Sequence, residues 1–213
     1  MIVVTGDKKN EISKETFRNV CGKYEKVILD LGTGDGRFVF KNAIKNKSTL
    51  YIGLDPAEKQ IQIYSKKSNR RRLKNVLYVI GSLENLPEEL YSTVDKIFIN
   101  LPWGTLLEKI VKSNETYTNE LFKILKKNGE IEIIFGYVPE LEPSETERLD
   151  LPVIENESDV LKAFSTFKKI FEVIEMKRLL KEDLDKIETT WAKKLKFGKD
   201  RFIYKIVLRK ITV

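Results

Sequence analysis

The chain has 213 residues, which is enough for one α/β domain with a sizeable core but short for two, so we interpret residues 1–213 as a single domain. It has no histidine and one cysteine, Cys21, which excludes an intramolecular disulfide and a thiolate zinc cluster and disfavours triad hydrolases and most metalloenzymes. The formal net charge of +7 favours a polyanionic partner such as a nucleic acid.

The N-terminal residues, MIVVTGDKKNEIS, lack the basic and then apolar layout of a signal peptide. No apolar run approaches the roughly 18 residues that a membrane span needs. We therefore expect a cytoplasmic, monomeric protein without a membrane or metal partner, and we interpret residues 1–20 as an N-terminal extension.

Short β-branched runs alternate with longer amphipathic stretches over the first two thirds of the chain. This alternation predicts an α/β fold in which helices cover both faces of a parallel sheet, because right-handed crossovers return each helix onto the sheet. The expected parallel strands are VILDL at 27–31, LYIGLD at 50–55, VLYVI at 76–80, VDKIFI at 94–99 and EIEIIF at 130–135.

The regular alternation stops after Phe135. Residues 137–157 contain three prolines and many carboxylates, so we interpret them as a long insertion between the fifth and sixth strands. The elements expected beyond it are a helix at 158–169, a strand at 171–179, a linker at 181–200 that includes the helical segment ETTWAKKLKF, and a last strand at 201–211. The two closing strands are expected to add an antiparallel hairpin to the sheet.

A glycine-rich turn, Asp30-Leu31-Gly32-Thr33-Gly34-Asp35-Gly36, follows the first predicted strand. Such a turn lets a ligand approach the main chain, and in dinucleotide sites the helix that follows it binds a phosphate. Here Asp30 and Asp35 bracket the glycines and repel an anion, whereas a cationic sulfonium with an ammonium group suits them. Asp55 ends the next strand, where a carboxylate accepts the hydroxyls of a ribose in both classes of site. The flanking acids favour a sulfonium donor, and a dinucleotide-dependent oxidoreductase stays a distant alternative.

The fourth predicted strand leads into Asn100-Leu101-Pro102-Trp103-Gly104-Thr105-Leu106-Leu107. Together with LDLGTGDGR, YIGLDP at 51–56 and the late WAKKL at 191–195 followed by Phe197-Gly198, this segment closely resembles the 16S ribosomal RNA adenine-1408 N1 methyltransferases of the Kam and Npm type, which confer aminoglycoside resistance. The resemblance covers nearly the whole chain. The glycine turn is shared by most class I methyltransferases, whereas PWGTLL and the WAKKL and FG block are particular to this group.

The resemblance implies a Rossmann-like class I fold with a mostly parallel seven-stranded sheet and an antiparallel last strand. It also implies S-adenosylmethionine as methyl donor, S-adenosylhomocysteine as product and the assembled 30S subunit with its 16S rRNA as substrate. Trp103 and Trp191 are expected to clamp the flipped base, next to Pro102. Donor contacts are expected at Asp30, Gly32, Gly34, Asp55, Pro56, Ser82, Leu83, Glu84, Leu101, Thr105 and Thr189, the last a position where the family commonly has serine.

Basic residues are expected to contact the RNA. Five cations fall within seven positions after the second strand, more than neighbouring acids can neutralise. The resemblance assigns the same stretch and Arg201 to RNA binding, with Arg201 at the phosphate of the flipped nucleotide. The expected RNA contacts are Lys66, Lys67, Arg70, Arg71, Arg72, Arg148, Lys194, Lys199 and Arg201.

Asn100 departs from the more apolar residue that the family pattern suggests. Asn100-Leu101-Pro102-Trp103 also approximates the asparagine-proline-proline-aromatic motif of methyltransferases that act on exocyclic amines, although the middle proline is missing. The sequence therefore leaves two target atoms open, the ring nitrogen N1 and an exocyclic amine.

Methylation at N1 suits a chain without histidine, because the in-ring lone pair is mostly unprotonated at neutral pH and needs no base. N1 lies on the Watson–Crick edge, so the base must leave its stack to be reached. Three further hypotheses remain: a class I methyltransferase for another RNA base, one for a small molecule, and a non-catalytic RNA-binding domain on the same fold.

Overall fold

Short apolar runs form the parallel strands at the centre of the sheet, where helices cover both faces and alternation with polar residues is not needed. The computed structural model describes residues 1–199 and 201–211. Its central strands are β3 (Lys26–Leu31), β4 (Thr49–Asp55), β5 (Val76–Ile80), β6 (Val94–Asn100) and β7 (Leu125–Phe135). All five predicted parallel strands are confirmed.

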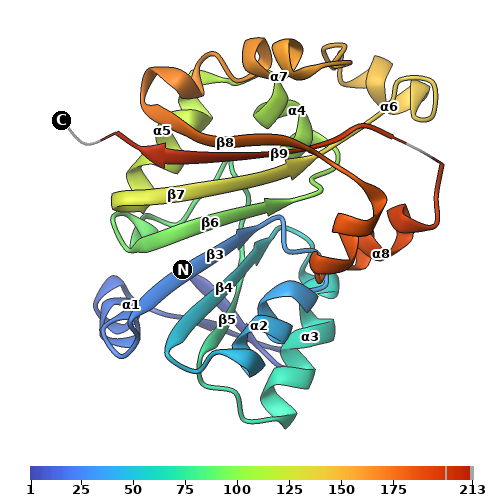
Figure 1. The fold of residues 1–213 in the computed structure, drawn as a ribbon. Coiled ribbons are helices and arrows are strands. Elements are labelled where there is room, and N and C mark those ends of the chain that lie inside the picture. The colour runs from blue at the N-terminus through green and yellow to red at the C-terminus, as the bar shows by residue number, and fades with distance from the viewer. Residues whose placement is uncertain (200, 212–213) are drawn as a thin grey trace.

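The strand order is β2-β1-β5-β4-β3-β6-β7-β9-β8 (Figure 1). The chain runs outward from β3 to β4 and β5, then returns to β6 on the other side of β3. Connections leave β3 and β6 in opposite directions, which opens a crevice at the carboxyl ends of these two strands. The functional site lies at this crevice.

The prediction of a seven-stranded sheet with a single antiparallel strand is wrong, since the described residues form nine strands in a mixed sheet. The two additional strands, β1 (Ile2–Thr5) and β2 (Lys8–Glu11), form a hairpin that pairs antiparallel with β5. Residues 1–20 are therefore more than an extension, and they also contain most of α1 (Lys14–Cys21). Strand β2 has almost no signal in the sequence, because KKNE is exposed at every position and shows no alternation.

The predicted closing hairpin is confirmed. β8 (Phe171–Leu179) and β9 (Ile203–Lys210) pair antiparallel, and β9 lies between β8 and β7. The predicted insertion holds α6 (Pro143–Arg148), and the predicted helix at 158–169 forms α7 (Glu157–Ala163) and a 3-10 turn, η2 (Phe167–Lys169). The predicted linker holds the 3-10 helix η3 (Lys181–Lys186) and α8 (Thr190–Lys196). Its last residue, Asp200, and the last two residues of the predicted domain lie outside the described residues.

Helices cover the sheet from both sides (Figure 1). On one face α1, α4 (Thr105–Val111), α5 (Glu115–Ile124) and α7 share the main apolar core, and the other face packs against α2 (Arg37–Lys45) and α3 (Glu58–Arg70). A third apolar cluster holds η3 and α8 against β7, β9 and Leu101. A short 3-10 turn, η1 (Glu88–Leu90), precedes β6. In residues 1–199 and 201–211, no helix has the length and apolar character to cross a membrane.

Candidate functional site

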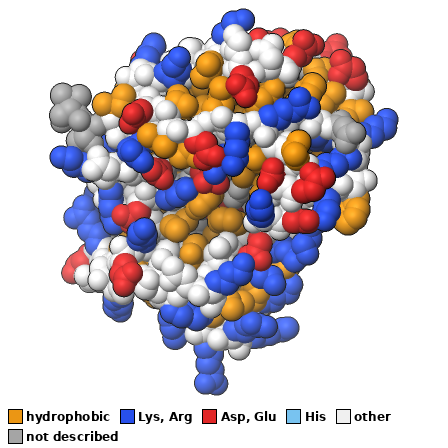
Figure 2. Space-filling view, viewed as in Figure 1, with side chains coloured by type: hydrophobic (Ala, Val, Ile, Leu, Met, Phe, Trp, Pro, Cys, Tyr) orange, Lys and Arg blue, Asp and Glu red, His pale blue; other side chains and the backbone are white. Residues whose placement is uncertain are grey.

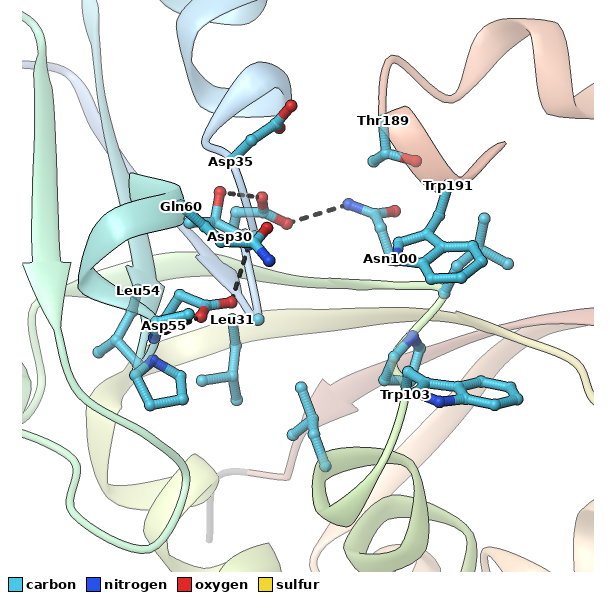
Figure 3. Close-up of a pocket in the computed structure, with 18 of the residues that line it drawn as sticks. Asp30, Leu31, Asp35, Leu54, Asp55, Gln60, Asn100, Trp103, Thr189 and Trp191 are labelled. Atoms are coloured by element: carbon cyan, nitrogen blue, oxygen red, sulfur yellow. Dashed lines mark hydrogen bonds between the residues drawn. The ribbon is translucent and has the colours of Figure 1, made fainter. Parts of the chain in front are cut away.

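A cavity of 560 Å³ lies at the carboxyl ends of β3, β4, β5 and β6 (Figure 3). This volume falls within the range of about 300–1,000 Å³ typical of small-molecule sites. The loops after these strands and the start of α8 line it. Every residue that the sequence assigns to the donor or to the base clamp lines this one cavity: Asp30, Gly32, Gly34, Asp55, Pro56, Ser82, Leu83, Glu84, Leu101, Pro102, Trp103, Thr105, Thr189 and Trp191.

The glycine turn holds the side chain of Asp55 in place. Gly34 adopts φ +57°, and its N–H donates to Asp55 Oδ2 at 2.8 Å while the N–H of Ala57 donates to Oδ1 at 2.8 Å. Burial raises the pKa of Asp55, and these two hydrogen bonds oppose the shift. A Cβ added at Gly34 meets no atom within 4 Å, so the turn faces open space at this point. Asp55 thus presents an oriented carboxylate to the cavity.

Asp30 is the penultimate residue of β3, next to β6, and is only 2% exposed. Its Oδ2 accepts a hydrogen bond from Thr33 Oγ1 at 2.6 Å, and its Oδ1 accepts one from Asn100 Nδ2 at 3.1 Å (Figure 3). Burial raises the pKa of Asp30 to about 6, against the effect of both hydrogen bonds. The nearby Asp55 and Asp35 carboxylates raise it further. Asp30 is therefore a carboxylate whose ionisation the fold disfavours.

Glu84, in the loop after β5, is already engaged by a cation from α4. Lys109 donates to Glu84 Oε1 and forms an ion pair with it. Partial burial disfavours ionisation of Glu84, but its contacts with Lys109 and its hydrogen bonds with Ser82 and the backbone together outweigh this and lower its pKa. Glu84 therefore presents an ionised, anchored carboxylate at the edge of the cavity.

The start of α8 is bonded to the glycine turn. Thr190 Oγ1 donates to Asp35 Oδ2 at 2.8 Å across a sequence separation of 155 residues. Thr189 caps α8, since its Oγ1 accepts from the N–H of Ala192 at 3.0 Å. The sequence places Asp35 in the glycine turn but predicts no contact between Asp35 and Thr190, because no local motif specifies a contact between these distant segments.

Trp103 and Trp191 face each other beside the cavity (Figure 3). Trp103 lies in the loop between β6 and α4, and Trp191 lies in the first turn of α8. Their ring centroids are 6.2 Å apart with an interplanar angle of 21°, and the side chains are 41% and 48% exposed. The two indoles therefore form an accessible, nearly parallel pair.

A second cavity of 200 Å³ adjoins the tryptophan pair and contains Pro102, Glu142 and Arg201. Arg201 Nη1 forms an ion pair with Glu142 Oε1 at 2.6 Å, and both side chains are largely buried. The sequence predicts Arg201 as a phosphate contact but did not predict its pairing with a carboxylate 59 residues away. In this structure Arg201 lies beside the indoles with part of its charge already neutralised.

Lysine and arginine gather on α2 and α3. Lys66, Lys67, Arg70, Arg71 and Arg72 are all exposed. Figure 2 shows this concentration of positive side chains at the lower end of the view, where α3 lies in Figure 1. A groove between the two helices is lined by Arg37, Phe40, Lys41, Tyr64, Lys67, Arg70 and Arg71. No acidic side chain is among these residues.

Aromatic rings hold two of these cations in position. Lys67 Nζ lies 3.9 Å from the Tyr64 ring centroid, and the Arg71 guanidinium lies 5.6 Å from that of Phe40. Arg37 and Lys41 were not predicted from the sequence, although their spacing of four places them on one face of a helix. We call Arg37, Lys41, Lys66, Lys67 and Arg70–Arg72 the α2–α3 basic patch.

The other predicted RNA contacts lie apart from this patch. Lys194 lines the main cavity with Nζ 5.0 Å from the Trp191 ring centroid, and Lys199 is exposed beyond the end of α8. Arg148 is held by Glu145 through two hydrogen bonds of 3.0 and 2.7 Å. Within the described residues, no group of three or more His, Cys, Asp or Glu side chains is arranged to hold a metal ion.

The strand order, the glycine turn after β3 and the acid at the end of β4 define a class I methyltransferase fold. A family model described as NpmA, 16S rRNA (adenine(1408)-N(1))-methyltransferase, matches residues 2–210. A 16S rRNA (adenine(1408)-N(1))-methyltransferase of Escherichia coli is 33% identical over 97% of each chain. This chain belongs to the 16S rRNA (adenine(1408)-N(1))-methyltransferase family.

Solved structures of methyltransferases are also similar to this chain. The 30S ribosomal A1408 methyltransferase from an uncultured bacterium is 40% identical, with a TM-score of 0.78 over 99% of this chain and 100% of that one. The aminoglycoside resistance methyltransferase NpmB1 is 29% identical, with a TM-score of 0.81 over 99% of this chain and 100% of that one. The family and the methyltransferase fold expected from the sequence are confirmed.

Proposed function

We propose that this enzyme transfers a methyl group from S-adenosylmethionine to N1 of adenine 1408 in 16S rRNA of the assembled 30S subunit, and thereby confers aminoglycoside resistance. The enzyme class follows from the family. Because the proposed substrate is the ribosomal subunit, we place the reaction in the cytoplasm.

The main cavity suits S-adenosylmethionine in size and charge. The donor carries a sulfonium and an ammonium group, and the cavity offers the carboxylates of Asp30, Asp35 and Asp55. Asp55, with both oxygens oriented by backbone N–H groups, is placed to accept ribose hydroxyls. Asp30 is the acid that balances the ammonium group, and the loop with Ser82 and Leu83 borders the adenine. A dinucleotide fits poorly, because these acids repel its pyrophosphate.

The indole pair suits a flipped base. A base stacked on both rings needs ring planes about 6.8 Å apart, from a stacking distance of about 3.4 Å on each side. Because the separation of the ring planes cannot exceed the centroid separation of 6.2 Å, the two rings move apart to admit a base. Aromatic stacking contributes about 1–3 kcal/mol per base, which offsets much of the cost of unstacking.

The chemistry requires positioning rather than proton removal. The lone pair of adenine N1 forms a bond to the methyl carbon as the carbon–sulfur bond breaks, which yields S-adenosylhomocysteine and a cationic N1-methyladenine. The protein holds the nucleophile in line with the methyl carbon, an effect worth about 7–11 kcal/mol in favourable cases. Leu101 has φ +51° and donates its N–H to the Ile134 carbonyl at 2.7 Å, so the loop that carries Pro102 and Trp103 is fixed to β7.

The α2–α3 basic patch and Arg201 are the proposed RNA contacts. The patch has no acid in its groove, so its cations are available to phosphates, whereas Arg201 is oriented by Glu142 beside the clamp. Arg148 is a weaker candidate because Glu145 already pairs with it, and Lys194 and Lys199 are weaker because they lie apart from the patch, on or just beyond α8.

The observation that carries the proposal is the nearly parallel pair of indoles beside a cavity lined by four carboxylates. The test is transfer of tritiated methyl from S-adenosylmethionine to purified 30S subunits, with the modified nucleotide mapped by reverse transcription. We expect a stop at adenine 1408, because N1 methylation blocks base pairing.

Subunits with guanosine at position 1408 are the matched control, because guanine N1 carries a proton and has no free lone pair. Incorporation at another nucleotide would contradict the proposed site but keep the enzyme class. No incorporation into any RNA would contradict the proposed function.

A further inference from the structure

Asn100 links the two halves of the site. It ends β6, directly across the crevice from the end of β3, and is 9% exposed. Its Nδ2 donates to Asp30 Oδ1 at 3.1 Å, and its side chain also borders the cavity. Figure 3 shows the amide lying between the Asp30 carboxylate on one side and Trp191 on the other. Its nitrogen is therefore directed at the donor side of the site.

Asp30 depends on such donors. Its carboxylate is almost fully buried and close to two other carboxylates, and both conditions disfavour its charge. Asn100 donates a hydrogen bond to Oδ1 of Asp30, and Thr33 donates one to Oδ2. A hydrogen bond to the charged form of an acid stabilises that form, so removing either donor favours protonation.

We propose that Asn100 is a positioning residue for the methyl donor: its amide keeps the Asp30 carboxylate oriented and ionised toward the donor's ammonium group. This inference rests on the proposed function. The family pattern suggests a more apolar residue at position 100. On this inference the asparagine serves donor binding and does not hold an exocyclic amine of the target base.

The role predicts a specific change in pH dependence. A protonated Asp30 binds an ammonium group weakly, so donor affinity falls as the pH decreases through the pKa of Asp30, which is about 6. Replacing Asn100 by leucine removes the donor, raises that pKa and moves the midpoint of the affinity profile to higher pH. We expect a shift of about one pH unit, which corresponds to a loss of about fivefold in affinity near pH 6 and a much smaller loss at pH 9.

Other charged groups also line the cavity. Asp35, Asp55, Glu84 and Lys194 line it with Asp30, and burial also raises the pKa of Asp55. In the described structure no hydrogen bond joins them to Asn100, so replacing Asn100 acts on them only through Asp30. The difference between the two profiles therefore reports on Asp30.

The experiment is calorimetric titration of the full chain with S-adenosylhomocysteine from pH 5.5 to 9. Asn100→Leu and the near-isosteric Asn100→Asp are compared with the unsubstituted protein, and Asn100→Asp is expected to shift the midpoint further because it adds an acid. Asn42→Leu is the matched control, since Asn42 donates only to the Phe38 carbonyl on α2. It should leave the midpoint unchanged.

Methylation of 30S subunits at saturating S-adenosylmethionine and pH 9 completes the test. We expect kcat of Asn100→Leu to stay within about twofold of the unsubstituted value. An unshifted midpoint, or a large loss of kcat with normal donor affinity, would overturn the inference and return Asn100 to the target base. If the unsubstituted protein binds no S-adenosylhomocysteine at any pH, the proposed function fails with it.

Discussion

The carboxylate of Asp30 lies near the end of β3 with almost no solvent exposure, and three further acids share its cavity. Burial raises its pKa from 3.8 to about 6. The folded state therefore binds a proton that the unfolded chain releases between these pH values. The stability contributed by this group is fully present below pH 4 and is lost as the pH rises through 6. At neutral pH the ionised Asp30 opposes folding by about 3 kcal/mol.

Asp30→Asn is accordingly expected to raise the thermal midpoint of the ligand-free protein at pH 7.5 by several degrees. The variant can keep both local hydrogen bonds, because the new amide oxygen accepts from Asn100 and the new amide nitrogen donates to Thr33. It should also lose the stabilisation that S-adenosylhomocysteine gives. Thermal unfolding with and without the ligand measures both effects. A lower midpoint without ligand would show that Asp30 stabilises the fold.

Trp191 lies in the first turn of α8, and Phe197 directly follows the helix. Both side chains are exposed, but only Trp191 faces another ring, that of Trp103. Trp191→Ala is expected to reduce kcat/KM for 30S methylation by roughly 10- to 100-fold, from the loss of about 1–3 kcal/mol of base stacking. Donor affinity should change little. Phe197→Ala, which removes a ring that is 86% exposed, is the control and should retain activity. An equal loss of donor affinity in Trp191→Ala would contradict its role at the base.

At the scale of elements, α8 carries residues for both sides of the site. Thr189 lines the donor cavity, Thr190 bonds to Asp35 in the glycine turn and Trp191 faces Trp103. A second contact is the ion pair of Lys45 and Glu188 at 3.0 Å, with side chains that are 63% and 29% exposed, and such a partly exposed pair is expected to contribute little. An apolar cluster holds α8 against the sheet, and the Thr190–Asp35 hydrogen bond then fixes the start of α8 to the glycine turn.

Thr190→Val removes this bond at constant shape and is expected to lower the methylation rate about fivefold, since one hydrogen bond contributes about 1 kcal/mol. Asp35→Ala, which removes the acceptor, should have a similar effect at saturating S-adenosylmethionine, and the double variant should be little worse than either single one, as for residues that act through one contact. Lys45→Met, which breaks only the exposed ion pair, is the control. Additive losses in the double variant would show that the two residues act separately.

The elements that the sequence predicted correctly are those with a local signal. Apolar runs identify β3 to β7, and turn chemistry locates the glycine loop and its acids. The edge strand β2 has no such signal, and the pairs Arg201–Glu142, Thr190–Asp35 and Asn100–Asp30 join residues far apart in the chain. Their geometry depends on how α8, the insertion and the two halves of the sheet pack, which no local pattern encodes.

Over the whole molecule, positive charge is unevenly placed. The α2–α3 basic patch lies toward the β1 and β5 side of the sheet, whereas Lys168 and Lys169 are exposed near β8 at the opposite edge. Counterion release makes affinity for RNA fall with salt in proportion to the number of phosphates that the protein neutralises. Salt dependence can therefore separate a local RNA contact from a general effect of net charge.

Lys67→Glu with Arg71→Glu is expected to weaken binding to 30S subunits and to reduce the slope of log affinity against log salt by about one for each phosphate that the variant no longer neutralises. Lys168→Glu with Lys169→Glu makes the same change in net charge at the far edge and should preserve the slope. Filter binding over a series of salt concentrations gives both values. Equal changes in the two double variants would indicate that only net charge matters.

Trp103 and Trp191 are the only two tryptophans in the sequence, and the structure stacks them against each other. All indole fluorescence of this protein therefore originates beside the cavity. A base that enters between the rings separates two coupled chromophores and quenches their emission, so the unlabelled enzyme carries an optical probe of base flipping. Rapid mixing with subunits can then time the arrival of the base separately from methyl transfer.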